Sequence, residues 1–276
     1  MSPSDAYNET SSCGGDCGVD FTQESHSHNV LLFGETGVGK SSVINMLVGK
    51  EVAEVSSGAT GCTFSCERYE TNLNGRGFVL WDTIGLNEGD FGRIPPDDAE
   101  RRLKTLMRTV EDGLSLLIYV IRGTRYREIL RINYDLFYRG LCGGRVPVVV
   151  VITGLENEQS MDSWWYENKD VLGRNGMEFK DKACVTTIRG KPIANGGCMF
   201  DEEYEESERK VKELIVQNYL PIPAAITGKG GDEHSKSSWL EGRLGTGSEI
   251  NGHHQGHEKK SRIGKFIAWL HQFLAF

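Results

Sequence analysis

The chain has 276 residues, which is long enough for one substantial hydrophobic core with polypeptide to spare for tails. Its formal net charge of −8 argues against a nucleic-acid partner, because an acidic surface repels phosphates. The 7 cysteines are an odd count, and neither a secretory segment nor an apolar run of membrane-spanning length is present. We therefore expect a cytoplasmic protein with reduced thiols.

The polar residues 1–28 are expected to form a disordered tail. Val30–Phe33 is a short apolar run that predicts a buried strand, and Lys40–Val48 has the apolar spacing of a helix. Between this strand and helix lies a glycine-rich loop. Together with the residue that follows it, we expect this loop to bind a nucleotide through Gly34, Glu35, Thr36, Gly37, Val38, Gly39, Lys40, Ser41 and Ser42.

A strand, a glycine loop and a helix start in this order are typical of a phosphate-binding loop (P-loop). Backbone N–H groups and the helix dipole then point at one place, which becomes an anion site for the phosphates of a nucleotide. Lys40 is expected to reach the terminal phosphates, and the Ser41 hydroxyl to ligate Mg²⁺. A plain glycine-rich turn is the alternative, but it leaves the Lys-Ser pair at the helix start unexplained.

The polar stretch 56–63 precedes Phe64–Thr71, whose alternating and partly polar pattern predicts an edge strand. In nucleotide-dependent switches, a threonine in such a stretch completes the Mg²⁺ shell while the γ-phosphate is present. We expect Thr63 to take this role, with Thr60 as the alternative.

The next apolar strand, Phe78–Trp81, is followed by Asp82-Thr-Ile-Gly85. In GTP-hydrolysing switch proteins the aspartate of this motif holds Mg²⁺ through water, and the glycine N–H contacts the γ-phosphate. The motif is common by itself, and a turn with an N-cap aspartate is the alternative. Behind a P-loop it gains weight, because neighbouring parallel strands direct their carboxyl ends to one crevice.

Apolar runs and helical patterns alternate onward to about Leu220, which predicts an α/β fold of the P-loop NTPase type. We expect a mostly parallel sheet of about six strands, with helices on both faces. The remaining strands are expected at Leu114–Ile121, Val146–Thr153 and Ala183–Thr187, and the remaining helices at Asp97–Asp112, Arg127–Gly140, Asp162–Leu172 and Glu202–Asn218.

The stretch Thr153-Gly-Leu-Glu156 follows a strand at the place where switch GTPases carry Asn/Thr-Lys-x-Asp. A carboxylate there accepts from the guanine N1–H and 2-amino groups; adenine lacks both donors, so Glu156 favours GTP over ATP. Gly154 replaces the usual lysine, so the side chain that covers the base is missing. Thr187, with Thr186, is expected to offer a backbone N–H to the guanine oxygen.

Residues 29–223 are thus the expected nucleotide-binding domain. Residues 224–262 are rich in glycine, serine, histidine and charge, as in a flexible linker. Residues 263–276 place apolar side chains at helical spacing behind basic ones. This amphipathic segment can lie at a membrane interface, dock on a partner or pack back on the domain.

Taken together, the stretches 34–41, 59–66, 82–85 and 123–126 resemble the septin-like branch of translation-factor-class GTPases. Within that branch the chain is most similar to the immunity-associated (IMAP-type) and chloroplast import-receptor (Toc) GTPases. The resemblance spans 29–220 and implies a domain that binds GTP or GDP with Mg²⁺.

The resemblance also bears on catalysis. Ras-like enzymes place a water-orienting glutamine where this chain has Leu86, which implies slow hydrolysis. Related GTPases dimerise across their nucleotides and supply an arginine in trans. Arg125, with Arg122 second, matches the position of that arginine, and a solvated charged turn is the alternative.

Three functions remain open from the sequence. The first is a Mg²⁺-dependent GTP-binding switch with catalytic roles for Lys40, Thr63, Gly85 and Arg125 and a metal site of Ser41, Thr63 and Asp82. The second is a P-loop phosphotransferase that acts on a small molecule. The third is a scaffold that binds the nucleotide without turning it over.

Overall fold

The computed structural model describes residues 27–50, 65–84, 106, 108–110, 112–194 and 196–226. Several predictions from the sequence lie outside these residues: the tail before residue 27, Thr60, Thr63, Gly85, Leu86, most of the helix at 97–112, and everything after residue 226. Within the described residues, every helix is too short or too polar to cross a bilayer.

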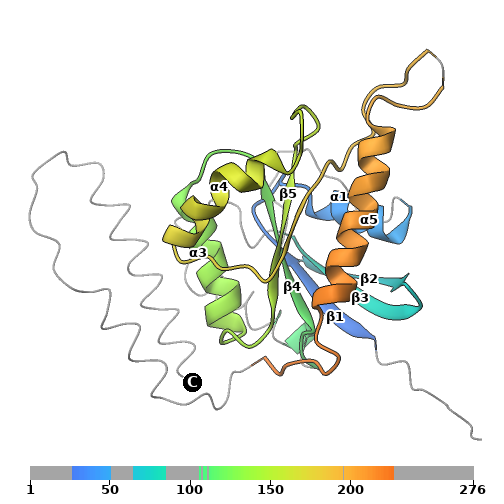
Figure 1. Ribbon diagram of the computed structural model, residues 1–276. Helices are drawn as coiled ribbons and strands as arrows, with labels where there is room; N and C mark the ends of the chain where they lie inside the picture. The colour runs from blue at the N-terminus through green and yellow to red at the C-terminus, as the bar shows by residue number, and fades with distance from the viewer. Residues whose placement is uncertain are drawn as a thin grey trace, which may run out of the picture.

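The predicted α/β fold is confirmed, with a six-stranded sheet in the order β2-β3-β1-β4-β5-β6 (Figure 1). All neighbouring strands are parallel except β2 and β3, which form an antiparallel pair at one edge. The strands are β1 His28–Phe33, β2 Ser65–Leu73, β3 Arg76–Ile84, β4 Leu116–Arg122, β5 Val148–Thr153 and β6 Lys182–Cys184.

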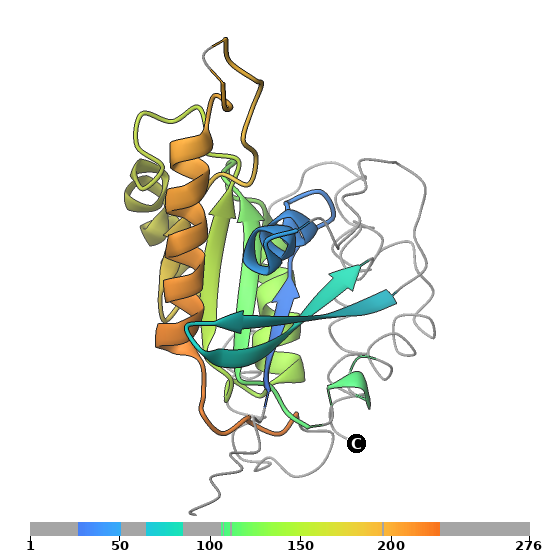
Figure 2. The ribbon, with the colours of Figure 1, turned by 90° about the vertical axis from the view of Figure 1, so that its right-hand side faces the viewer.

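Helices cover both faces of the sheet, as expected (Figures 1 and 2). On one face, α1 and α5 pack against the side chains of β1 and β4 that include Val30 and Ile118. On the other face, α3, η1 and α4 pack against the alternate side chains, which include Leu31 and Tyr119. The helices are α1 Lys40–Val48, α3 Glu128–Tyr134, η1 Asp135–Leu141, α4 Ser163–Arg174 and α5 Asp201–Asn218.

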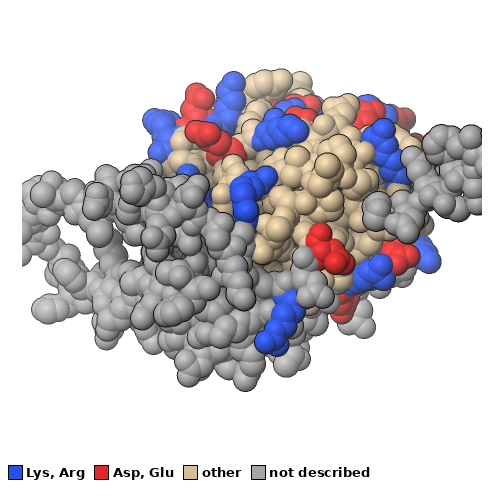
Figure 3. All heavy atoms as spheres, turned by 90° about the horizontal axis from the view of Figure 1, so that it is seen from below, with Lys and Arg blue, Asp and Glu red and all other residues tan. Residues whose placement is uncertain are grey.

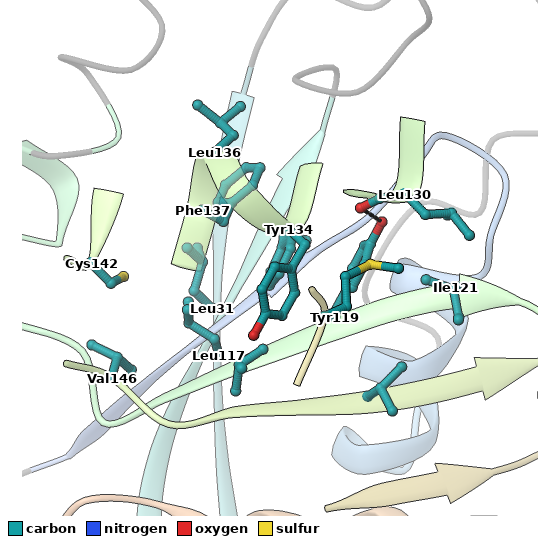
Figure 4. Close-up of a cluster of buried hydrophobic side chains, with 14 of the residues drawn as sticks. Leu31, Leu117, Tyr119, Ile121, Leu130, Tyr134, Leu136, Phe137, Cys142 and Val146 are labelled. Carbon is teal, nitrogen blue, oxygen red and sulfur yellow. Dashed lines mark hydrogen bonds between the residues drawn. The ribbon is translucent and has the colours of Figure 1, made fainter. Parts of the chain in front are cut away.

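Aromatic rings join the second layer to the sheet (Figure 4). Phe33 of β1 stacks on Tyr119 of β4, with 4.6 Å between ring centroids, and on Phe137 of η1 at 4.5 Å. The buried Tyr119 hydroxyl donates to the Leu130 carbonyl at 2.8 Å, so its polar end is satisfied inside the core. This packing fixes α3 beside the end of β4.

The helix predicted at Arg127–Gly140 is wrong in its second half, where η1 follows as a π-helical run. The wider turn buries Leu136, Phe137 and Leu141 together against the sheet, which a continued α-helix would spread around its axis. The last strand ends earlier than predicted. Its continuation leaves the sheet because the Thr186 N–H donates to the Ser207 hydroxyl at 3.0 Å.

The chain returns to the start of β4 after α5. Leu114 and Ala224 exchange two backbone hydrogen bonds, of 3.0 and 2.8 Å, and Leu220 donates to the Ser115 carbonyl. Ala224 and Ile226, which we expected to begin the linker, therefore still pack on the domain. Seen from this end, the described surface carries Lys, Arg, Asp and Glu side chains around an uncharged area (Figure 3).

Candidate functional site

The P-loop is shaped by how closely its first glycine approaches the sheet. Gly34 has φ +151°, and a Cβ on it would lie 2.1 Å from the Val120 carbonyl oxygen of β4. No side chain fits there, because the obstacle is backbone. Gly37 and Gly39 also have positive φ, of 76° and 99°, so the loop curls in a conformation that favours glycine. Gly39 then starts α1 as its N-cap.

Lys40 lies inside this curl and is only 8% exposed. Its ammonium group donates to the carbonyl oxygens of Gly34 at 3.0 Å and Glu35 at 3.1 Å. The loop carbonyls therefore turn inward to the lysine, which suits a loop whose N–H groups face an anion.

The predicted metal residues Ser41 and Asp82 are in contact. The Ser41 hydroxyl donates to Asp82 Oδ2 at 2.8 Å, because β1 and β3 are adjacent and end at the same edge. The Asp82 side chain is fully buried, and within the described residues its Oδ1 has no hydrogen-bond partner. An unsatisfied buried carboxylate oxygen beside a serine hydroxyl fits a Mg²⁺ site with its water shell.

The electrostatics of Asp82 point the same way. Burial raises the pKa of this carboxyl, and the charge of Lys40 and the hydrogen bond from Ser41 oppose that rise only in part. Glu67, its cross-strand partner on β2, raises the pKa further. A cation at this point would relieve both the burial and the repulsion between the two carboxylates.

The Thr153 side chain packs against the P-loop. Its hydroxyl donates to the Val38 carbonyl at 2.5 Å, and a Cβ on Gly39 would lie 3.6 Å from both the Thr153 methyl group and the Thr187 hydroxyl. The end of β5 and the loop after β6 therefore meet at the P-loop. Sequence reasoning placed Thr153 beside the base but missed this support, which joins residues far apart in the chain.

Glu156 lies with the threonines that follow β6. Its Oε2 accepts from the Thr186 hydroxyl at 3.4 Å. The Thr186 N–H is already bound by Ser207, so Thr187 is left as the residue whose N–H is available within the described structure. The three residues predicted to meet guanine are thus brought to one edge of the sheet.

The loop after β4 carries three arginines in three different settings. Arg127 forms an ion pair of 2.5 Å with Glu35 of the P-loop, a contact that no motif predicts. Arg125 is exposed, and its side chain has no ion pair or hydrogen bond within the described residues. Arg122 lies against Gly154.

Asp162 anchors the loop that carries Glu156. At the start of α4, its carboxylate binds the ammonium groups of Lys182 on β6 at 3.1 Å and Lys210 on α5 at 3.2 Å. Burial alone would raise the pKa of Asp162, but the hydrogen bonds and charges of the two lysines outweigh it and lower the pKa.

We expect Gly34→Ala to abolish binding of nucleotide phosphates and to lower the free energy of unfolding by about 1–3 kcal/mol, because the methyl group meets β4 backbone. The matched control is Gly49→Ala, where φ is +75° but the space is open. It costs about 1–2 kcal/mol through strain alone and leaves binding intact. Urea unfolding measures the free energy of unfolding, and calorimetry measures phosphate binding. Equal binding by the two variants contradicts the prediction.

Asp162→Asn tests the ion pairs of Asp162 with Lys182 and Lys210 through the pH dependence of stability. A lowered pKa stabilises the fold above the ordinary carboxyl pKa of 3.8, and this contribution is lost as the pH falls through the lowered value. The variant should unfold more easily than wild type at pH 7, by less than about 1 kcal/mol for a pair this exposed, and the difference should shrink as the pH falls below 3.8. Asp170→Asn, on the exposed side of α4, should follow wild type throughout; a pH-independent difference for Asp162→Asn would count against the ion pairs.

The chain is similar to known GTPases. Residues 29–153 match the family model described as 50S ribosome-binding GTPase. The chain is 31% identical over 209 residues to immune-associated nucleotide-binding protein 3 of Arabidopsis thaliana, covering 72% of this chain and 56% of that one. It is 26% identical over 254 residues to GTPase Der of Rhizobium etli, covering 81% and 49%. The chain thus spans about half the length of these curated relatives.

Solved structures show the same fold. A structure of the chloroplast translocon components atToc33 and psToc159, in which dimerization is important for GTPase activity, has a TM-score of 0.55 at 19% identity and covers 74% of this chain and 88% of that one. Era of Aquifex aeolicus has a TM-score of 0.50 at 17% identity, covering 70% and 56%. With its P-loop and its Ser41–Asp82 contact, the chain carries a GTP-binding domain that matches the 50S ribosome-binding GTPase family model over residues 29–153; its resemblance to the IMAP-type GTPases is confirmed by the plant relative, and the Toc structure shares its fold.

Proposed function

We propose that the chain is a Mg²⁺-dependent switch protein that binds GTP, hydrolyses it slowly and is stimulated by self-association. The observation that carries the proposal is the group formed by Lys40, Ser41 and Asp82 at the ends of β1 and β3. A kinase or a nucleotide-binding enzyme would share the lysine. The buried aspartate with one unsatisfied oxygen, followed by a glycine at 85, favours a switch that responds to the γ-phosphate.

Each residue then has a defined role. The backbone N–H groups of residues 34–42 and the Lys40 ammonium bind the phosphates. Ser41 and Asp82 would hold the ion, Asp82 through water, and Thr63 and Gly85 would complete the contacts that depend on the γ-phosphate. With Mg²⁺ bound, the metal neutralises charge on the phosphates.

Guanine is selected by Glu156 and Thr187, which follow β5 and β6 at the same edge of the sheet as the P-loop. The Glu156 carboxylate, held near Thr186, accepts from the base, and the Thr187 N–H donates to its oxygen. An adenine nucleotide would leave this carboxylate without donors, which is a strong basis for rejection.

Self-association supplies a catalytic arginine that the single chain lacks. Leu86 stands where a water-orienting glutamine would be, so the isolated domain hydrolyses GTP slowly. Arg125 is exposed and unpaired within the described residues, whereas Arg127 is held by Glu35 of its own P-loop. Arg122, the third arginine of this loop, lies against Gly154, so Arg125 is the one that we expect to reach the nucleotide of a second copy.

Calorimetry with GTP and ATP, with and without Mg²⁺, tests nucleotide binding. Wild type should bind GTP at least tenfold more tightly than ATP, and EDTA should weaken GTP binding. Lys40→Ala should abolish binding of both, whereas Glu156→Ala should lose the preference for GTP. Lys50→Ala, just after α1, is the control and should bind as wild type does. Equal affinity of wild type for ATP and GTP would remove the guanine claim and leave the P-loop assignment intact.

Turnover measured against protein concentration tests self-association. The rate per molecule should rise with concentration, and Arg125→Ala should remove this rise, since an arginine in trans contributes about 10³–10⁵ in rate. Arg174→Ala, at the far end of α4, should keep it. Tight GTP binding with no phosphate release at any concentration would instead identify a scaffold without turnover.

A further inference from the structure

Gly154 lacks the side chain that usually covers the base, and the side chain of Arg122 lies against it. The residue has φ +76°, and a Cβ on it would lie 3.2 Å from Nε of Arg122 and 3.3 Å from its Cγ and Cζ. The stem and guanidinium of Arg122 therefore run across the place where a side chain at 154 would begin. The usual lysine of this motif would compete with Arg122 for the same space.

The backbone holds Arg122 in this position. In the pairing of β4 with β5, Arg122 is the partner of Thr153, and the Gly123 N–H donates to the Thr153 carbonyl at 2.8 Å. A Cβ on Gly123 would lie 2.3 Å from Leu155 Cδ2, so the loop after β4 is pressed onto the residues that lead to Glu156. The position of Arg122 over Gly154 is thus set by the sheet.

The guanidinium of Arg122 is available for a ligand. Arg122 ends β4 as its exposed residue, and within the described structure its side chain has no ion pair or hydrogen bond. Glu35, the nearby carboxylate of the P-loop, is already paired with Arg127. A planar cation that is weakly hydrated and unpaired is well suited to lie on the face of an aromatic ring.

We propose that Arg122 covers one face of the nucleotide base and so replaces the side chain that Gly154 lacks. This inference rests on the proposed function, in which Glu156 binds the edge of the same base from two residues further along. The carboxylate selects guanine through its hydrogen bonds, and the guanidinium adds affinity for any purine. Arg122 is therefore a binding residue in cis, while Arg125 acts on a second copy.

Calorimetry of Arg122→Ala with two probes, GDP and inorganic tripolyphosphate, both with Mg²⁺, tests this role. The variant should bind GDP about 2- to 30-fold more weakly, which is the range of a cation on an aromatic face. Tripolyphosphate has no base, so its affinity should not change. Arg122→Lys should fall between wild type and alanine for GDP, because it keeps the charge but loses the plane.

Arg174→Ala is the matched control and should bind both probes as wild type does. An equal loss for both probes would assign Arg122 to the phosphates and overturn the proposal. Unchanged GDP affinity, with or without a loss of stability, would overturn it too, whereas a wild type that binds no GDP would refute the proposed function itself.

Discussion

The P-loop of this chain curls around its own lysine. The Lys40 ammonium binds two carbonyl oxygens of the loop, and this is possible only because Gly34 lies so close to the backbone of β4 that no side chain fits. With the carbonyls directed at the lysine, the N–H groups are left for an anion. The same curl brings the Val38 carbonyl to the Thr153 hydroxyl, and the adjacency of β1 and β3 then sets Ser41 beside Asp82.

The parts of the fold with strong local patterns could be predicted from the sequence. The helix at Lys40–Val48 was predicted residue for residue, because a glycine bounds it at each end and its apolar face is regular. The buried strands β4 and β5 were predicted from their nearly continuous apolar runs. Propensity could not predict η1, because its wider turn is set by how Phe137 meets the sheet.

The site could be predicted where a motif fixes the chemistry and not where distant residues meet. The residues that the motifs assign to one site do lie together, since Ser41 contacts Asp82 and Glu156 contacts Thr186, whereas their roles remain predictions. The contact of Arg127 with Glu35 and the position of Arg122 over Gly154 depend on the register between strands. Nothing in the local sequence distinguishes these three neighbouring arginines, yet the structure pairs Arg127 with Glu35, lays Arg122 against Gly154 and leaves Arg125 exposed.

The return of the chain to the start of β4 has a consequence for how the domain meets other molecules. Leu114 and Ala224 pair at the pole opposite the nucleotide edge, so the described polypeptide leaves the domain on the side away from Arg125 and the P-loop. The body of the sheet therefore separates residues 224–226 from the loops that we propose to bind the nucleotide.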